Sequence, residues 1–186
     1  IKEFSKECFV PFCVGGGIKS IEHIRGLLRA GADKVCINSE AYNNLNLIRE
    51  GAKLFGSQCI VISVDFKCID EKYYCFSQSG NFNTGILVEE WVKIVEEAGA
   101  GEIILTSIDK DGTMSGYDLE IIKKVVDIVS IPVIASGGAG KYEDMFKAIN
   151  YSKASAVAAA SIFHFTEMTP KEAKMYLSNK GIATRS

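Results

Sequence analysis

The sequence lacks the features that mark membrane, secreted and nucleic-acid-binding proteins. No apolar run approaches the length of a membrane span, and residues 1–10 lack the charged-then-apolar order of a signal peptide. The formal net charge is only -2 with 24% charged residues, so there is no basic field for nucleic acid or anionic lipid. We therefore expect a cytoplasmic protein that holds any anionic ligand through local backbone geometry.

Histidine is scarce, and cysteine is not arranged for a metal site or a disulfide framework. His23 and His164 fall on separate helical stretches with no cysteine or carboxylate at ligand spacing, so we expect no metal site. The six cysteines include no CxxC spacing, and Cys13, Cys36 and Cys59 lie in apolar, strand-like runs. We interpret them as free thiols that serve as small core residues in a reducing compartment.

What the sequence does have is a regular alternation of strand-like and helix-like segments over a length that suits one domain, residues 1–186. The expected strands are 9–14, 34–37, 59–65, 102–106, 132–135 and 156–159. The expected helices are 20–30, 45–55, 86–98, 119–129, 142–149 and a last one that opens at Thr169-Pro170. The polar and aromatic segment 69–83 predicts a hairpin. Six such units predict a parallel sheet, either doubly wound or closed as a barrel.

An internal repeat favours the barrel. Residues 10–41 and residues 131–163 share a proline-led strand, a double glycine, a helix, a second short strand and a serine. Two equivalent quarters indicate a duplicated half-barrel, which closes naturally into eight strands. Because the chain begins on Ile1 and not on Met, we expect a partial (βα)₈ TIM barrel of the α/β class whose two further βα units would precede Ile1.

The stretch CIVISVDFK places a carboxylate, Asp65, at the end of a buried strand. An apolar run broken only by Ser63 is typical of a strand covered on both faces. A charge at its end has to point toward the loops, where barrels hold their active sites. The simpler alternative is that Asp65 caps the following turn.

The repeat also carries two candidate phosphate sites. Gly16-Gly17 with Asn38-Ser39, and Gly137-Gly138 with Ala160-Ser161, each combine close-approaching backbone N–H groups with a hydroxyl at the start of a short helix. Glycines in such loops also serve simple tight turns. A ligand with a phosphate at each end would span the barrel mouth with Asp65 near its middle.

The loop over residues 107–118 adds carboxylates beside the second candidate site. The polar residues are Asp109, Asp111, Thr113 and Asp118, and helix capping and turn formation explain some of them. Asp111 is the one we single out, because it stands just before Gly112 at the junction of strand and loop. No Ser-His-Asp arrangement is present. The available chemistry is therefore acid/base catalysis by carboxylates.

Together these motifs resemble the HisF family, the cyclase subunits of imidazole glycerol phosphate synthase in histidine biosynthesis. The segments that carry the resemblance are PFCVGGGI, GADKVCINS, FGSQCIV, VDFK, NTGI, GAGEIILTSIDKDGTMSGYD, IPVIASGGAG and AASIFHF, and they cover essentially the whole chain. The resemblance implies a lyase that combines ammonia with the diphosphorylated substrate PRFAR to give imidazole glycerol phosphate and AICAR, without a cofactor. It also implies a partner, the glutamine amidotransferase subunit HisH, docked at the amino-terminal face and feeding ammonia through the barrel.

The resemblance further implies roles for individual residues. Asp65 would be a catalytic aspartate, and Asp111 would assist it. Lys34 and Glu102 would belong to the charged gate at the ammonia entrance, and Asp33 would face the amidotransferase. The substrate- and phosphate-binding residues would be Gly17, Asn38, Ser39, Thr106, Gly112, Ser136, Gly138 and Ser161.

The sequence departs from the family pattern at three places. Ser39 stands where the family more often has threonine, which keeps the hydroxyl, and Cys68 replaces a usual arginine. The family's other catalytic aspartate lies on the first strand, which we expect to precede Ile1. We therefore expect this chain by itself to be inactive or nearly so.

Three alternatives remain at this stage. The sister isomerase of the same pathway shares both phosphate sites but uses no ammonia, so the matches at Lys34 and Glu102 favour the cyclase. A cyclase-like paralogue that carries out ammonia-dependent amidination in surface-sugar synthesis is disfavoured by Asp65 together with the intact DKDGT loop. A non-catalytic fragment with two open sheet edges is the third.

Overall fold

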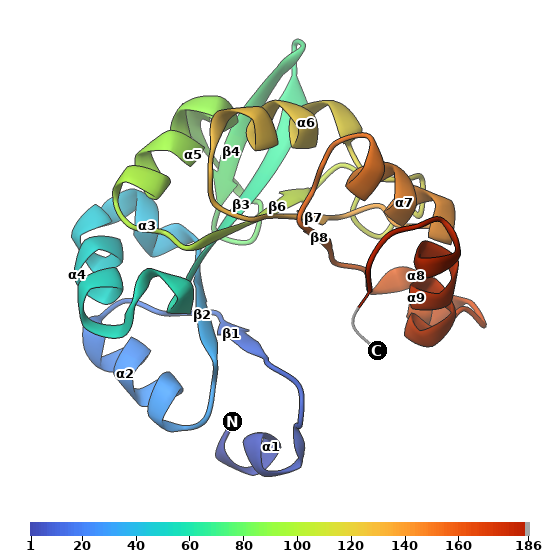
Figure 1. Cartoon of the computed structure of the whole chain (residues 1–186). Coiled ribbons are helices and arrows are strands. Elements are labelled where there is room, and N and C mark those ends of the chain that lie inside the picture. The colour runs from blue at the N-terminus through green and yellow to red at the C-terminus, as the bar shows by residue number, and fades with distance from the viewer. Residues whose placement is uncertain (185–186) are drawn as a thin grey trace.

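The computed structural model describes residues 1–184 and shows a parallel sheet curved into an open arc, with helices on its outer side (Figure 1). The neighbouring strands run parallel in the order β1-β2-β3-β6-β7-β8. They are β1 (Cys13–Gly15), β2 (Lys34–Ile37), β3 (Ile60–Ile69), β6 (Glu102–Ser107), β7 (Val133–Ser136) and β8 (Ala156–Val157). The expected alternation and the partial barrel of duplicated half-barrel type are confirmed.

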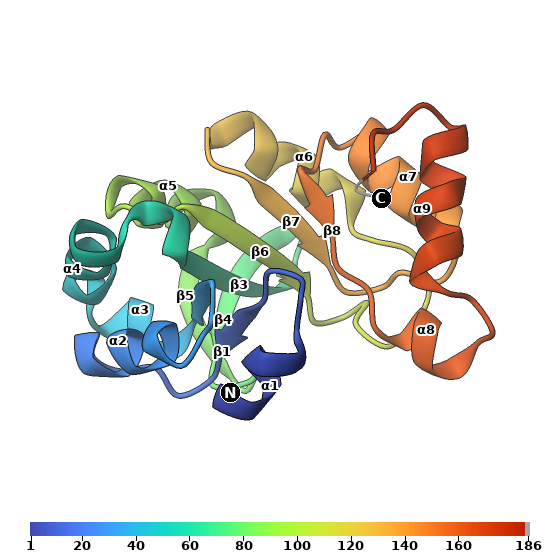
Figure 2. The same ribbon diagram turned by 60° about the horizontal axis from the view of Figure 1, so that its bottom comes forward.

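Most of the helices follow strands, and the longer ones among them cover the convex face of the arc (Figures 1 and 2). The helices are α1 (Lys2–Glu7), which precedes β1, α2 (Ile21–Arg29), α3 (Ser39–Asn43), α4 (Leu45–Phe55), α5 (Val88–Glu97), α6 (Leu119–Ile128), α7 (Tyr142–Asn150), α8 (Ser161–Phe165) and α9 (Pro170–Asn179), with a 3-10 turn at Ser57–Cys59. Helix α9 begins at a capping box in which Thr169 and Glu172 satisfy each other's backbone N–H groups. Within residues 1–184 no helix combines the length and the apolar character needed to cross a membrane.

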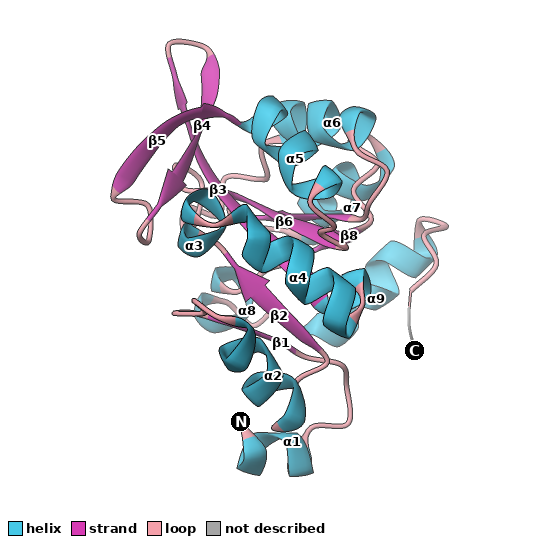
Figure 3. Ribbon diagram, turned by 90° about the vertical axis from the view of Figure 1, so that its left-hand side faces the viewer, coloured by secondary structure: helices cyan, strands magenta, loops and turns pink. Residues whose placement is uncertain are grey.

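Strand β3 is longer than the sequence pattern predicts, so the expectation that it ends at Asp65 is wrong. It continues to Ile69 and pairs antiparallel with β4 (Lys72–Ser77), which pairs in turn with β5 (Phe82–Leu87). The hairpin projects from one side of the sheet (Figure 3). Asp70 and Glu71 form its two-residue turn with φ of 49° and 61°, the left-handed geometry that such hairpins require. Asp65 therefore lies inside a strand, at the level where β3 leaves the parallel sheet.

Alternation along the strands separates an inner, concave face from an outer face under the helices. Along β3, Val64 and Phe66 are fully buried, whereas Ser63 and Asp65 are half-buried on the inner face. The register pairs Asp65 with Thr106 and Thr106 with Ser136, so these residues form one row across three strands. The row crosses the inner face near the carboxyl ends of β6 and β7.

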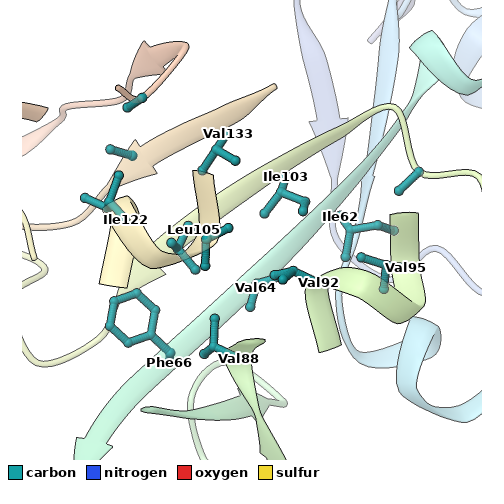
Figure 4. Packing of buried hydrophobic residues seen from close by; sticks show 14 of the residues in the cluster. Ile62, Val64, Phe66, Val88, Val92, Val95, Ile103, Leu105, Ile122 and Val133 are labelled. Carbon is teal, nitrogen blue, oxygen red and sulfur yellow. The ribbon is translucent and has the colours of Figure 1, made fainter. Parts of the chain in front are cut away.

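The main core lies between the outer face of the sheet and the helices. Buried side chains of β3, β6 and β7 pack against those of α5 and α6 (Figure 4). The labelled members of this layer are Ile62, Val64, Phe66, Ile103, Leu105 and Val133 from the strands and Val88, Val92, Val95 and Ile122 from the helices. Because these residues occupy every second position of each strand, the inner face is left free for polar groups.

The cysteines are free, as expected, but the expectation that they serve as core residues is wrong for most of them. Only Cys75 is buried, while Cys13 and Cys68 are exposed. Cys36 lies on β2 and is half-buried, and Cys59 lies in the 3-10 turn before β3. The physical reason is that side chains alternate between the two faces of a strand. In a short strand, apolar neighbours therefore do not show whether a cysteine points to the core or to the inner face.

Two neighbouring residues of β6 test this separation of faces. Leu105 is fully buried under the helices, whereas Ile104 is half-buried on the inner face. We expect Leu105→Ala to lower the free energy of unfolding by about 2–5 kcal/mol and Ile104→Ala to lower it by less than half as much, measured by urea denaturation. Equal losses would contradict the assignment of the core to the outer face.

Candidate functional site

Two cavities open at the carboxyl ends of the strands, and they gather most of the predicted site residues. The first has a volume of about 580 Å³ and is lined by Gly16, Gly17, Asn38, Ser39, Ser63, Asp65 and Gln78 among others. The second has a volume of about 150 Å³ and is lined by Asp111, Gly112, Ser136, Gly138 and Ser161 among others. The row of Asp65, Thr106 and Ser136 links the two.

The two cavities share an unusual backbone geometry. The glycine pairs have positive φ: 100° and 67° for Gly16-Gly17, and 86° and 106° for Gly137-Gly138. Asn38 (φ −123°, ψ −93°) and Ala160 (φ −128°, ψ −62°) both leave the ordinary strand and helix regions, and each precedes the serine that begins a short helix. The sequence repeat is therefore also a repeat of backbone conformation.

The cavities differ in what covers them. A Cβ on Gly137 would lie 2.6 Å from the carbonyl oxygen of Ser107, and one on Gly138 would lie 2.3 Å from that of Gly116, so the loop after β6 packs directly on this turn. The hydroxyl of Tyr117 donates to the carbonyl of Ala158 at 2.9 Å and fixes that loop to the chain after β8. A Cβ on Gly16 or Gly17 would meet no atom within 4 Å.

The first cavity is covered by the antiparallel hairpin, which sequence reasoning did not place there. The backbone N–H of Gln78, in the β4–β5 turn, donates to the hydroxyl of Ser39 at 3.0 Å. Ser39 accepts through its oxygen and keeps its own proton to donate to a ligand. The segment 69–83 predicted a hairpin, but no local pattern shows how far its turn reaches.

The carboxylate of Asp65 is held at both oxygens. The amide nitrogen of Asn38 donates to Oδ2 at 2.8 Å, and the hydroxyl of Ser63 donates to Oδ1 at 2.9 Å. Burial raises the pKa of Asp65 above its ordinary value, the two hydrogen bonds oppose this, and the charge of Asp111 adds to the rise. The side chain is thus fixed in position, and its proton is held more tightly than in free aspartate.

Ser63 is a site residue that sequence reasoning missed, although a signal was present. It is the one polar residue in the apolar part of the strand, two positions before Asp65. A spacing of two places both side chains on the same face of a strand. Asn38, which the resemblance implies as a phosphate-binding residue, donates one amide N–H to Asp65 and has a second N–H besides.

Lys34 and Glu102 lie at the opposite, amino-terminal end of the inner face. They form a half-buried ion pair, with side chains 32% and 20% exposed, that reaches from β2 to β6 across β3. Asp33 precedes β2 at this end, is exposed, and accepts a hydrogen bond from the N–H of Phe12 at 2.9 Å. The inner face therefore carries polar groups at both of its ends.

Two further predicted residues, Asp111 and Thr106, lie close to Asp65. Asp111 is exposed in the loop after β6 and faces the second cavity, near enough to Asp65 to affect its pKa. Thr106 stands beside Asp65 in the row on the inner face. In the part of the chain that is described, no three histidine, cysteine or acidic residues are grouped so as to hold a metal ion.

Comparison with known proteins identifies relatives over the whole chain. Residues 1–169 match a protein family described as "Histidine biosynthesis protein". The chain is 52% identical to a Natranaerobius thermophilus protein named imidazole glycerol phosphate synthase subunit HisF, over 100% of this chain and 74% of the relative. Proteins of the same name from Dehalococcoides mccartyi and from a Hydrogenobaculum species are 48% and 49% identical, each over 73% of its own length.

The environment of Asp65 predicts a stability that depends on pH. The pKa of Asp65 in the folded chain lies above the ordinary value of 3.8, so Asp65 ionises at a lower pH in the unfolded chain than in the folded chain. At a pH above both pKa values the carboxylate is charged in both states, and its burial then lowers the free energy of unfolding. We expect Asp65→Asn to unfold at a higher temperature than the parent chain at pH 7, and we expect this difference to shrink as pH falls below 4. Calorimetry at several pH values measures it, and an unchanged difference across pH would contradict the assignment.

Proposed function

The chain belongs to the family of histidine biosynthesis proteins, as a HisF-type cyclase subunit of imidazole glycerol phosphate synthase, and from this we propose that Asp65 is an acid/base residue of the cyclase reaction. The reaction joins ammonia to PRFAR and releases imidazole glycerol phosphate and AICAR. The single observation that supports this role best is the position of Asp65: a fixed carboxylate with a raised pKa, on the row that links the two cavities related by the repeat.

The two cavities fit the two phosphate groups of this substrate. In the first, Gly17 and the hydroxyl of Ser39 provide donors; in the second, Gly112, Gly138, Ser136 and Ser161 surround a smaller space. Turns with positive φ leave backbone N–H groups free to point at an anion. With one phosphate in each cavity, the reacting centre of the substrate would lie over Asp65 and Thr106.

The chemistry requires proton transfer at this centre. Ammonia that adds to an electrophilic carbon has to lose protons, and ring closure has to lose water. A carboxylate held by Asn38 and Ser63 can accept a proton in one step and return it in another. Asp111, on the side of the second cavity, is placed to assist as a second carboxylate.

The opposite end of the inner face fits the entry of ammonia. Lys34 and Glu102 are paired there, and Asp33 is exposed beside them. We assign Lys34 and Glu102 to a charged gate, and Asp33 to the surface that contacts a glutamine amidotransferase subunit of HisH type. A cytoplasmic location and a small diphosphorylated substrate complete the proposal.

Replacement of Asp65 tests the catalytic assignment. In the protein that carries the two further βα units implied by the resemblance, we expect Asp65→Asn to lower turnover of PRFAR with ammonium salts by about 10²–10⁴-fold and to leave substrate affinity within about tenfold. Asp127→Asn, at an exposed carboxylate of α6, is the matched control. A near-normal rate in Asp65→Asn would show that this carboxylate is structural.

A charge placed in the second cavity tests the phosphate assignment. Ser161→Asp puts a carboxylate where the second phosphate would sit, so we expect PRFAR to bind at least tenfold more weakly in titration calorimetry. Ser178→Asp makes the same change at an exposed position of α9 and should leave binding unchanged. If both variants bind PRFAR as the parent does, the second cavity is not a phosphate site.

A further inference from the structure

A buried carboxylate that the proposed mechanism does not use lies behind the second cavity. Asp144 stands in the first turn of α7 and is only 8% exposed. Among the described residues 1–184 no cation forms an ion pair with it. Its Oδ2 accepts hydrogen bonds from the backbone N–H groups of Gly140 and Lys141, both at 3.0 Å. Because a buried charge is costly unless hydrogen bonds hold it, these two bonds keep Asp144 in place.

The two N–H groups that Asp144 holds come directly after three that have no acceptor. Gly137, Gly138 and Ala139 are buried and line the second cavity. Within residues 1–184 their N–H groups donate to no backbone or side-chain acceptor. Buried N–H groups are nearly always paired, so this run of donors indicates that the cavity takes an acceptor-rich ligand such as a phosphate.

The turn that carries these donors has little stiffness of its own. Three of the four residues from 137 to 140 are glycine, which adopts many backbone conformations at low cost. Contacts from other segments therefore have to fix the turn. One is the N–H of Gly116, which donates to the carbonyl oxygen of Gly138 at 2.7 Å. Asp144 supplies the other, and a Cβ on Gly116 would lie 3.5 Å from its Oδ1, so the two restraints are adjacent.

The first half of the repeat makes the same contact with a different side chain. His23 and Asp144 each lie six residues after the second glycine of their pair. The Nδ1 of His23 accepts from the N–H of Lys19 at 3.4 Å, and Lys19 occupies the position of Gly140. What an imidazole nitrogen and a carboxylate oxygen share is the ability to accept a hydrogen bond. Both halves therefore tie the same N–H group of the turn back to the following helix.

We propose that Asp144 is a positioning residue for the second cavity. Its carboxylate fixes the N–H groups of Gly140 and Lys141, so that the turn is held in the conformation in which the N–H groups of residues 137–139 are free for a phosphate. Asp144 acts through the turn, since it is not among the residues that line the cavity. The inference rests on the proposed binding of phosphate in this cavity.

The sign of the effect separates positioning from simple electrostatics. A carboxylate near an anion repels it, so removal of the charge of Asp144 would by itself strengthen phosphate binding. Loss of the positioning contact has the opposite effect, because the turn is then free to leave the binding conformation. Weaker binding after the charge is removed is therefore a result that the charge alone does not produce.

Replacement of Asp144 tests the proposal in the protein that carries the two further βα units implied by the resemblance. We expect Asp144→Ala to weaken PRFAR binding by about tenfold in titration calorimetry, and to raise KM by a similar factor while kcat stays within about threefold. Asp144→Glu is the second variant, because glutamate at this position still caps a helix but its carboxylate lies one methylene farther from the backbone. It should unfold at the same temperature as the parent and bind PRFAR about threefold more weakly.

Glu172→Ala is the matched control. Glu172 caps α9 from the same helical position, accepting from the N–H of Thr169 at 3.2 Å, and lines neither cavity. Its loss should lower the unfolding temperature and leave PRFAR binding unchanged. The positioning role is overturned if both Asp144 variants bind PRFAR as tightly as the parent or more tightly while Ser161→Asp binds it weakly. If Ser161→Asp also binds PRFAR normally, the phosphate assignment itself fails.

Discussion

The alternation of side chains along a curved parallel sheet is the constraint on which the rest of this structure depends. Each strand sends every second residue into the helix layer, where burial of Ile62, Val64 and Leu105 stabilises the fold. The residues between them are left to the concave face, on the side of the sheet away from the helix layer. Polar groups that would be costly in the core gather there: the ion pair of Lys34 with Glu102 at one end, and Asp65 at the other. The core and the candidate site therefore both result from the two-residue alternation of side chains along each strand.

Much of the fold could be predicted from the sequence because its signals are local. The order of the elements follows from amphipathic helical patterns, from short apolar runs, and from the double glycines at 16–17 and 137–138. The internal repeat indicates the barrel. The end of β3 was mispredicted because a charge at Asp65 was interpreted as a stop. The residues beyond it, from Phe66 to Ile69, become steadily more exposed, and they pair with β4 of the hairpin, a long-range contact that no local pattern of the strand shows.

The candidate site was predicted unevenly for the same reason. Residues at the ends of strands, such as Ser39 and Ser161, follow from the repeat, and the structure places them in equivalent turns. Contacts between distant segments did not follow: the N–H of Gln78 on Ser39, and the amide of Asn38 on Asp65, join residues 39 and 27 positions apart. Cysteines were misplaced because a short strand gives too few positions to show which face each residue takes. Such contacts depend on tertiary packing, which a single sequence does not encode locally.

The two cavities are covered by different segments of the chain, and this difference affects the orientation in which a ligand can bind. Duplication by itself would produce a pseudo-twofold arrangement with interchangeable ends, and a long molecule could then bind in either of two opposite senses. Here the first cavity is covered by the β4–β5 turn and has a volume of about 580 Å³. The second cavity is covered by the loop that Tyr117 fixes and has a volume of about 150 Å³. The two coverings thus differ between the two halves of the repeat, and under the proposed assignment an asymmetric substrate would bind over Asp65 in one orientation only.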